Sequence, residues 1–265
     1  AHGRAELTFA SGPRGSTLRH LFHAAPLRVL FPTPEPGDLP GAALVNVGGG
    51  LAGGDSLETL VRIEEGAGAS LTTPAAEKVY RSLDAATRLT TALTLAEGAM
   101  LEWLPQETIL FDGARLERRM QVHLAPDARL LAAEMVVFGR VARGERLRQG
   151  AFFDSWRLWR DGRLHWADAT RLAQDPAASL EAPFGFGGAE AMAVLLLAGS
   201  VAEATAGRAV LREAGHAATL ARPGLLMARF LGKASDVREA LAAAIPALRA
   251  TAFGLPPRLP RLWAS

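Results

Sequence analysis

The chain has 265 residues, 49% of them hydrophobic, which is enough to build one sizeable core. It has no cysteine, so disulfides, thiolate zinc sites, iron–sulfur clusters and cysteine nucleophiles are excluded. The formal net charge is only +2, and the basic residues alternate with acids, a pattern that argues against a nucleic-acid partner.

The sequence carries no pattern typical of secretion or membrane insertion. The N-terminus lacks a basic stretch followed by an apolar one, and no apolar run approaches the length of a transmembrane helix. We therefore expect a cytoplasmic protein with no membrane partner.

Alternating apolar and polar residues predict β-strands through the first two-thirds of the chain. The strand anchors Val61, Leu93 and Val122 are 32 and then 29 residues apart (93 − 61 and 122 − 93). Similar turns follow the three strands, and we match Gly68–Leu71 with Gly98–Leu101 and Asp127–Leu130. A strand–turn–strand unit that recurs about every thirty residues favours stacked β layers. Ordinary hairpins in a β-sandwich are the alternative.

The glycine-rich segment Gly48–Gly53 spells a dinucleotide-binding fingerprint, which we reject. That fingerprint needs a helix that begins at the glycines, whereas Asp55 and an alternating strand follow here. A sharp backbone path that presents Asp55 explains the glycines better.

The segment Thr72–Ser82 holds Lys78, one of only two lysines, and Tyr80, the only tyrosine. One explanation is that both residues occur by chance on a surface strand. A polar site that needs a point charge and a phenol, with Arg81 beside them, is the functional interpretation.

The segment Trp103–Gly113 places Glu107 and Asp112 in an apparently buried strand that ends at an Asp-Gly turn. A buried carboxylate costs several kcal/mol unless it is paired or used. The sequence leaves two explanations for these acids: they pair with arginines, or they belong to a functional site. For most of the later charges, bidentate Arg–carboxylate pairs are the favoured interpretation. Asp161-Gly162 reads as a hairpin turn.

The last seventy-five residues change character. Ala191–Ala198 and Leu225–Leu231 read as strands. Ser200 and Glu203 form a predicted capping box for one helix, which Gly215 can end. Ser235 is the predicted cap of a second helix, whose apolar face carries Val237, Leu241, Ile245 and Leu248 and which Pro246 should kink or shorten. The Pro-rich tail then folds back on the body or docks on a partner.

These patterns predict a mostly β fold, a helix-like stack of β-strand layers with two α-helices toward the C-terminus. We expect a single domain over residues 1–265, with stacked β layers in 1–190 and an α/β segment in 191–265 packed on them. The six histidines show no metal-ligand spacing and no serine lies in a nucleophile elbow, so neither a permanent metal centre nor a catalytic triad is indicated.

Taken together and in chain order, the motifs resemble the UreD (UreH) family of urease accessory proteins. The motifs are Ala25–Val29, Gly48–Asp55, Thr72–Ser82, Trp103–Gly113, Phe138–Arg140 with Gly144-Glu145, and Asp161–Leu164. They span roughly residues 25–170, and the C-terminal third matches in character only.

The resemblance implies a non-catalytic chaperone of nickel urease. Such a protein would form an accessory complex, as a homo-oligomer, with UreF and the GTPase UreG and would dock on the urease apoprotein. There it would help deliver nickel to an active site built on a carbamylated lysine. We expect no tightly bound cofactor and only transient Ni(II), because carboxylates and hydroxyls release such a metal readily.

The candidate functional positions follow from these segments. The polar candidates are Asp55, Lys78, Tyr80, Arg81, Gln106, Glu107, Asp112, Glu134 and Asp154. Among them Asp55, Glu107 and Asp112 are the candidates for a transient nickel path. A partner interface is expected at Leu241, Leu259, Leu262 and Trp263. A β-stack enzyme acting on polysaccharide and a purely structural scaffold between UreF and urease are the competing functions.

Overall fold

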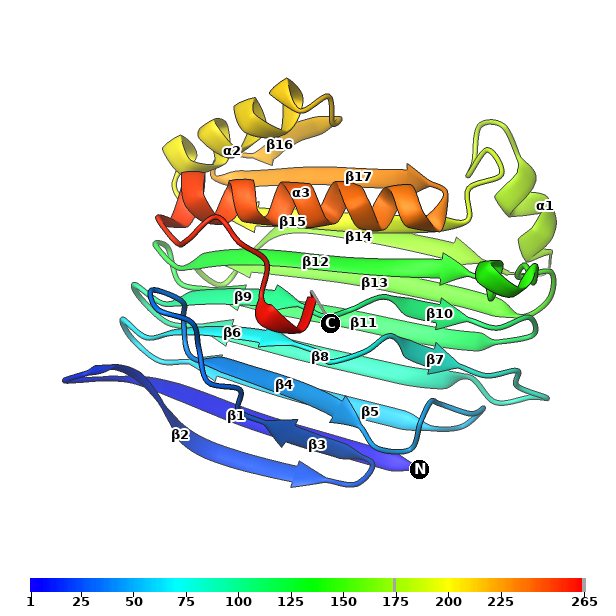
Figure 1. Cartoon of the computed structure of the whole chain (residues 1–265), viewed down its shortest axis with the longest axis horizontal. Helices are drawn as coiled ribbons and strands as arrows, with labels where there is room; N and C mark the ends of the chain where they lie inside the picture. The colour runs from blue at the N-terminus through cyan, green and yellow to red at the C-terminus, as the bar shows by residue number, and fades with distance from the viewer. Residues whose placement is uncertain (174, 264–265) are drawn as a thin grey trace.

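The chain winds back and forth between two β-sheets, which a computed structural model describes for residues 1–173 and 175–263 (Figure 1). Over these residues one sheet has seven strands in the order β14-β13-β11-β8-β5-β1-β2. Its strands are β1 (His2–Gly12), β2 (Gly15–Ala24), β5 (Ser56–Ile63), β8 (Thr87–Leu95), β11 (Arg115–Leu124), β13 (Ala151–Arg160) and β14 (Arg163–Leu172).

The other sheet has ten strands within the same ranges. Its strands are β3 (Leu27–Leu30), β4 (Gly41–Asn46), β6 (Gly68–Thr72), β7 (Glu77–Val79), β9 (Met100–Leu104), β10 (Thr108–Leu110), β12 (Arg129–Phe138), β15 (Ala191–Ala198), β16 (Ala218–Arg222) and β17 (Leu225–Gly232). Neighbouring strands β1, β5, β8, β11 and β13 are parallel in one sheet, and β4, β6, β9 and β12 are parallel in the other. Successive coils therefore stack like the turns of a solenoid, which confirms the predicted helix-like stack of β layers.

The thirty-residue recurrence corresponds to this stacking. Val61 pairs with Leu93, and Leu93 pairs with Val122, so the three predicted anchors are register partners in adjacent coils. The predicted match of the turns is wrong by two residues in the first coil, because Ala69 pairs with Leu101 where we had matched Leu71. The true counterparts are Gly66 and Gly98, which both adopt a left-handed backbone with φ of 64° and 65°.

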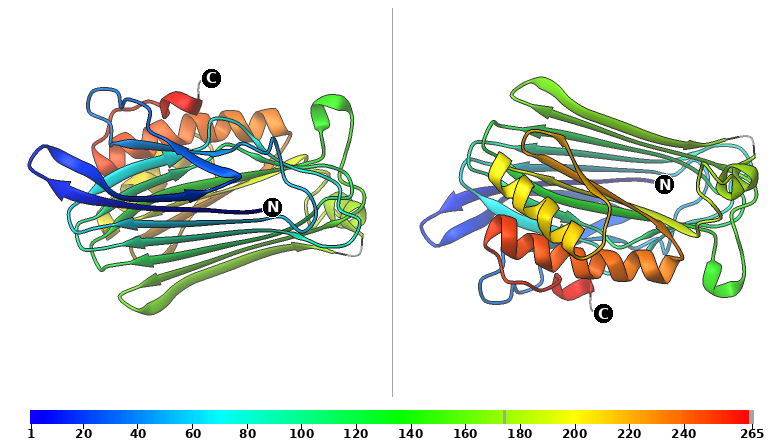
Figure 2. Two further views of the ribbon diagram at one scale, coloured as in Figure 1. Left: turned by 90° about the horizontal axis from the view of Figure 1, so that it is seen from below. Right: turned by 90° about the horizontal axis from the view of Figure 1, so that it is seen from above.

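The C-terminal segment adds antiparallel strands and helices to the second sheet. Strand β15 pairs with β12, and β17 pairs with β15 and β16. The helices α2 (Val201–Glu213) and α3 (Ala234–Phe253) lie on the outer side of this sheet (Figure 2). The remaining helical turns are α1 (Pro176–Glu181), η1 (Val141–Arg143) and η2 (Arg261–Trp263). No helix in residues 1–173 and 175–263 combines the length and the apolar character that a membrane crossing needs.

Several predicted details of this segment are confirmed, the predicted cap of α3 is wrong, and the shortening at Pro246 does not occur. The Ser200–Glu203 capping box forms, and Val237, Leu241, Ile245 and Leu248 are buried. However, α3 begins one residue before Ser235, with Lys233 at the cap position and no side-chain cap. The helix also continues through Pro246 to Phe253 and is not shortened there, because its apolar face stays packed along its length.

The apolar core has two main layers. One lies between the two sheets and includes Leu7, Val61, Leu93, Val122 and Trp156. The other lies between the second sheet and the two long helices. It brings together Leu131 and Met135 of β12, Leu195 of β15 and Leu241 of α3. Strand β15 has all eight residues buried because it contributes alternate side chains to both layers, which explains its continuous apolar sequence.

Candidate functional site

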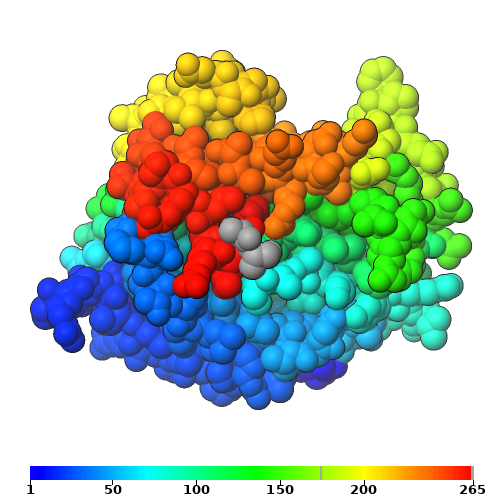
Figure 3. Space-filling model, viewed as in Figure 1, coloured from blue at the N-terminus to red at the C-terminus, as the bar shows by residue number. Residues whose placement is uncertain are grey.

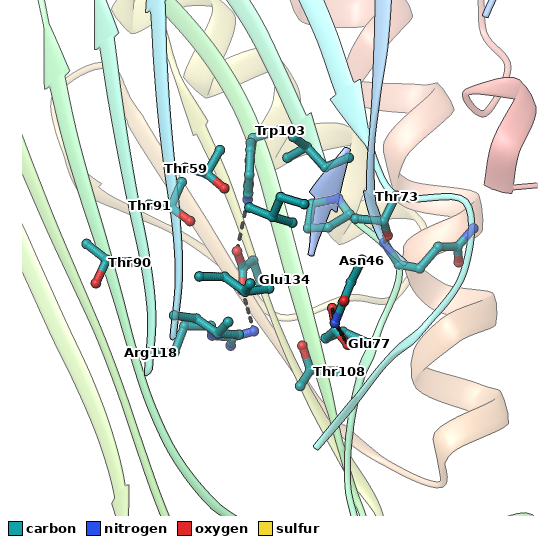
Figure 4. A pocket seen from close by; sticks show the side chains of 16 residues that line it. Asn46, Thr59, Thr73, Glu77, Thr90, Thr91, Trp103, Thr108, Arg118 and Glu134 are labelled. Atoms are coloured by element: carbon teal, nitrogen blue, oxygen red, sulfur yellow. Dashed lines mark hydrogen bonds and ion pairs between the residues drawn. The ribbon is translucent and has the colours of Figure 1, made fainter. Parts of the chain in front are cut away.

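A cavity of about 90 Å³ lies between the two sheets, and many of the residues that line it are polar (Figure 4). Such a volume has room for several water molecules. Its polar lining comes from both sheets and from the turns beside them: Asn46, Thr59, Thr73, Glu77, Thr90, Thr91, Gln106, Thr108, Arg118 and Glu134. Asn46, Thr73 and Glu77 are only partly buried, so this side of the cavity reaches the surface.

Glu77 is the most unusual group in this lining. Its two carboxylate oxygens accept hydrogen bonds from Asn46 Nδ2 at 3.0 and 3.1 Å. Within the described residues Glu77 forms no ion pair. Burial raises the pKa of its carboxyl to about 7, and the hydrogen bond from Asn46 only partly offsets this. Glu77 is therefore a carboxylate that can exchange its proton near neutral pH.

The acids Glu134 and Asp154 form a buried triad with Arg118. The Arg118 guanidinium donates to both Asp154 oxygens, from Nε at 2.9 Å and from Nη2 at 2.8 Å, and its Nη1 contacts Glu134. Trp103 Nε1 donates to Glu134 at 2.9 Å. Burial raises the pKa of Glu134, whereas its two carboxylate neighbours raise that of Arg118 despite desolvation. These two candidate acids are thus held by an arginine at one wall of the cavity.

The glycine-rich loop lies against strand β7, next to the cavity. Leu51 N donates to Lys78 O at 2.7 Å, and Tyr80 N donates to Leu51 O at 2.8 Å. Gly50 has a φ of 148°, and a Cβ at this position would lie 2.6 Å from Tyr80 Cε2. The glycine therefore lets the tyrosine ring pack directly on the loop, while Tyr80 Oη donates to Gly49 O at 2.8 Å. As predicted, a strand and not a helix follows this loop.

The short strands β7 and β10 have one side toward the cavity and the other toward solvent. Glu77 pairs with Thr108, and both line the cavity. The next pair, Lys78 and Ile109, lines a groove on the outer surface. This two-residue alternation is the ordinary geometry of a strand, so two neighbouring segments supply both the interior site and the exterior groove.

Side chains from three of the motif segments contact one another in the lining of this groove. The rings of Tyr80 and Phe111 meet edge to face with centroids 5.0 Å apart, and the Arg140 guanidinium lies 4.5 Å from the Phe111 centroid. Arg140 pairs with Glu145, whose carboxylate accepts from Asp112 N at 3.2 Å. The aromatic and ionic contacts thus hold residues 80, 111 and 140 in a fixed arrangement.

The three acids proposed for a nickel path lie in different places. Asp55 accepts from Ala52 N at 2.8 Å within its own turn and also contacts the amino group of Ala1. Asp112 Oδ1 accepts from the backbone amides of Arg148 and Gln149 at 2.7 and 2.9 Å. Glu107 pairs with Arg238 of α3. None of the three lines the interior cavity, although Glu107 lines the outer groove.

The remaining polar candidates are Lys78, Arg81 and Gln106. The Lys78 and Arg81 side chains are exposed. Gln106 is buried, lines the cavity and donates from Nε2 to Leu262 O at 2.7 Å. Arg238 Nη1 donates to Gln106 Oε1 at 2.7 Å, so Gln106 joins the cavity wall to α3 and to the C-terminal tail.

The tail folds back on the body, one of the two courses left open by its sequence. Trp263 is 5% exposed and its Nε1 donates to Leu104 O at 2.8 Å. Leu241 is 0% exposed within the core, and Leu259 packs partly buried against the same layer. Leu241 and Trp263 are therefore core residues in this structure and present no docking surface of their own, because folding already uses their apolar area. Leu262 is half-buried beside Gln106.

Sequence reasoning missed Glu77 and Asn46, although Glu77 lies in a motif segment that it singled out. The only local signal is that Glu77 precedes Lys78 by one residue, so a strand must turn the two side chains to opposite sides. The pairing with Asn46, 31 residues earlier, is a product of the stacking and has no local sequence signal.

The fold and these contacts define a solenoid-like β-stack in which several motif segments line a small cavity between the two sheets. The family model described as "UreD urease accessory protein" matches residues 1–264. The urease accessory protein UreD of Granulibacter bethesdensis is 52% identical over 242 residues, covering 89% of this chain and all of that protein. The urease accessory protein UreD of Magnetococcus marinus is 43% identical, and the match covers 98% of this chain and 93% of that protein. The chain belongs to the UreD urease accessory protein family.

Proposed function

We propose that this chain is a non-catalytic, cytoplasmic component of urease maturation that helps deliver Ni(II) to the urease apoprotein. In this proposal it acts with UreF and the GTPase UreG, in an accessory complex that holds more than one copy of the chain. Membership of the UreD family supports the maturation role.

The observation that carries the nickel part of the proposal is the environment of Glu77. Its carboxylate faces the cavity between the sheets, and its partner is a neutral amide and not an arginine. A carboxylate with threonine hydroxyls nearby offers oxygen ligands, which bind and release a divalent metal readily when few in number. Ni(II) would displace the Glu77 proton, so we expect binding to be weak, reversible and stronger above pH 7 than below it.

The test is co-expression of the urease subunits with UreF, UreG and this chain. We expect low nickel content and low ureolysis without the chain. Glu77→Gln should leave the complex intact but lower the nickel per urease active site several-fold. Glu213→Gln makes the same chemical change at an exposed position on α2 and serves as the control. Full nickel loading without the chain would refute the maturation role.

A structural scaffold between UreF and urease is the second candidate. It is favoured by the paired state of Glu107, Glu134 and Asp154, whose arginine partners leave them no free coordination role. The same experiment separates the two functions. A scaffold would give full nickel loading with Glu77→Gln, whereas a metal path through the cavity would not.

A further inference from the structure

The outer side of strands β7 and β10 forms a groove of about 480 Å³ whose rim is basic. Ile109, Phe111 and Val137 form an apolar floor, and η1 and the start of α3 form the walls. In Figure 3 this groove lies between the orange start of α3 and the green segment around residue 141. Its volume is that of an ordinary ligand pocket, large enough for one or two side chains of a partner.

One of the two lysines of the chain lines this groove, and the other adjoins a lining residue in sequence. Lys78 lines it, and Lys233 immediately precedes Ala234, which also lines it. All 27 other basic residues are arginines. Lysine supplies a compact charge on a flexible stem, whereas arginine suits fixed bidentate pairs. The placement of both lysines at or beside one surface groove is therefore a second indication, besides its shape, that the groove receives a charged group.

The positive charges at the rim have no ion-pair partner among residues 1–173 and 175–263. Lys78, Arg143 and Lys233 are exposed, and none forms an ion pair with another of the described residues. Three acids around the groove already have partners. Glu107 pairs with Arg238 and Glu145 pairs with Arg140. Glu190 accepts from Ala234 N at 3.2 Å and pairs with Arg146. Asp236 in the first turn of α3 is the nearest further acid along that helix. The groove thus keeps a net positive rim above an apolar floor.

The floor does not suit a nucleic-acid base. Base binding needs an exposed flat aromatic face. One face of Phe111 is covered by Arg140, and Tyr80 meets Phe111 edge to face. The rest of the floor is aliphatic. An apolar side chain flanked by carboxylates matches both the floor and the rim.

We propose that this groove binds an acidic segment of a partner protein, with an apolar side chain of that segment on Ile109 and its carboxylates at Lys78, Arg143 and Lys233. The inference rests on the proposed function, in that the partner is one of UreF, UreG and the urease apoprotein.

The first test measures the affinity of the purified chain for each of these three proteins. The double charge reversal Lys78→Glu with Arg143→Glu should weaken one of the three affinities by roughly tenfold or more, and should reduce its salt dependence. Arg14→Glu reverses an exposed charge in the turn between β1 and β2, at the far side of the stack, and should change the affinity less than about twofold.

The second test uses the rarity of lysine. A water-soluble carbodiimide joins an amine directly to a carboxylate with which it is in contact. Crosslinks in which this chain supplies the amine must come from Lys78, Lys233 or the terminal amine, and peptide mapping separates them from crosslinks between its acids and the partner's lysines. We expect peptide mapping to show Lys78 and Lys233 joined to Asp or Glu of one partner segment. The variant Lys78→Arg with Lys233→Arg should keep the affinity and lose both crosslinks.

The outcomes distinguish the two proposals. Binding of none of the three proteins by the unmodified chain would refute the proposed function and, with it, this inference. Tight binding that survives charge reversal and yields no lysine crosslink would refute the groove alone.

Discussion

At the scale of single residues, the energetic effect of each acid depends on its partner. Glu77 has a neutral partner, and its folded pKa of about 7 lies above its ordinary value of 4.5. Because folding raises this pKa, the fold favours the protonated carboxyl and its stability decreases as the pH rises. Its contribution to stability is complete below pH 4.5 and is lost as the pH rises through 7.

Glu77→Gln should remove this part of the pH dependence. The free energy of unfolding of the native chain should fall more between pH 5 and pH 8 than that of the variant, by at most about 3 kcal/mol. Urea denaturation at the two pH values measures the difference, and Glu213→Gln should follow the native chain. Parallel pH profiles for native and Glu77→Gln proteins would contradict a raised pKa at the partly buried Glu77.

Removing the arginine of the triad should destabilise the protein much more than neutralising one of its two acids. Arg118→Ala strands Glu134 and Asp154 as two like charges in the core and should cost about 3–5 kcal/mol. Glu134→Gln keeps an oxygen acceptor for Trp103 and leaves Arg118 paired with Asp154, so it should cost less than about 1.5 kcal/mol. Urea denaturation of both variants checks the order, and equal losses would show that the triad is not a charge network.

Sequence identified several of these acids but not their partners. Glu107 pairs with an arginine 131 residues away, and Asp154 pairs with Arg118, which the stacking places beside it on the neighbouring strand β11. Such partners are set by the register of whole coils, so no local pattern can name them. Asp112 shows a third outcome, since its carboxylate accepts from backbone amides and needs no charged partner.

At the scale of elements, local patterns predicted what depends on local physics. Alternation gave the strand faces, and Asp161 and Gly162, both at positive φ, form the predicted hairpin turn between β13 and β14. The Ser200 capping box formed because both of its hydrogen bonds lie within one turn. The start of α3 was misplaced because packing, and not a capping side chain, fixes it.

Trp263 is one of several residues that hold the C-terminal tail on the body, and the effect of removing its side chain should be measurable. Trp263→Ala removes the ring, its hydrogen bond to Leu104 O and its contact with Arg238, 5.4 Å from the ring centroid. We expect a loss of about 3 kcal/mol, at the low end for a buried tryptophan, because the tail can detach without leaving a sealed cavity.

Limited trypsin digestion gives the direct measurement for the tail. Cleavage after Arg258 and Arg261 should become much faster in Trp263→Ala. In the native chain Arg258 is held by Asp38 at 3.1 Å and by Pro36 O at 2.6 Å. Trp263→Phe keeps the packing and loses only the hydrogen bond, so its digestion should stay close to native. Unchanged cleavage in both variants would mean that the tail is held elsewhere.

At the scale of the whole molecule, the stacked layers and the C-terminal segment share one core. The outer side of β12 contributes Leu131 and Met135 to the layer that α3 completes, and β15 pairs with the edge of β12. Arg249 of α3, 1% exposed, donates to Glu102 of β9 at 2.6 Å and to Asp38 at 2.8 Å. The apolar layer on the outer side of the second sheet and the pairing of Glu102 and Asp38 with Arg249 therefore need both segments.

Residues 1–265 should therefore unfold as a single unit, as the expectation of one domain requires. Burying one large apolar side chain is worth about 1.5–3 kcal/mol, so losing the shared layer would exceed the 5–15 kcal/mol that stabilises a typical domain. Calorimetry should give one transition with equal calorimetric and van't Hoff enthalpies. A fragment of residues 1–190 should aggregate, since it exposes the edge of β12 and an uncovered apolar sheet face. The control Ser200→Ala in the full chain removes only a helix cap, so it should lower stability by about 1 kcal/mol and keep the single transition. Two resolved transitions, or a soluble 1–190 fragment that melts cooperatively, would show that the stack folds independently and that the C-terminal segment is a separate unit.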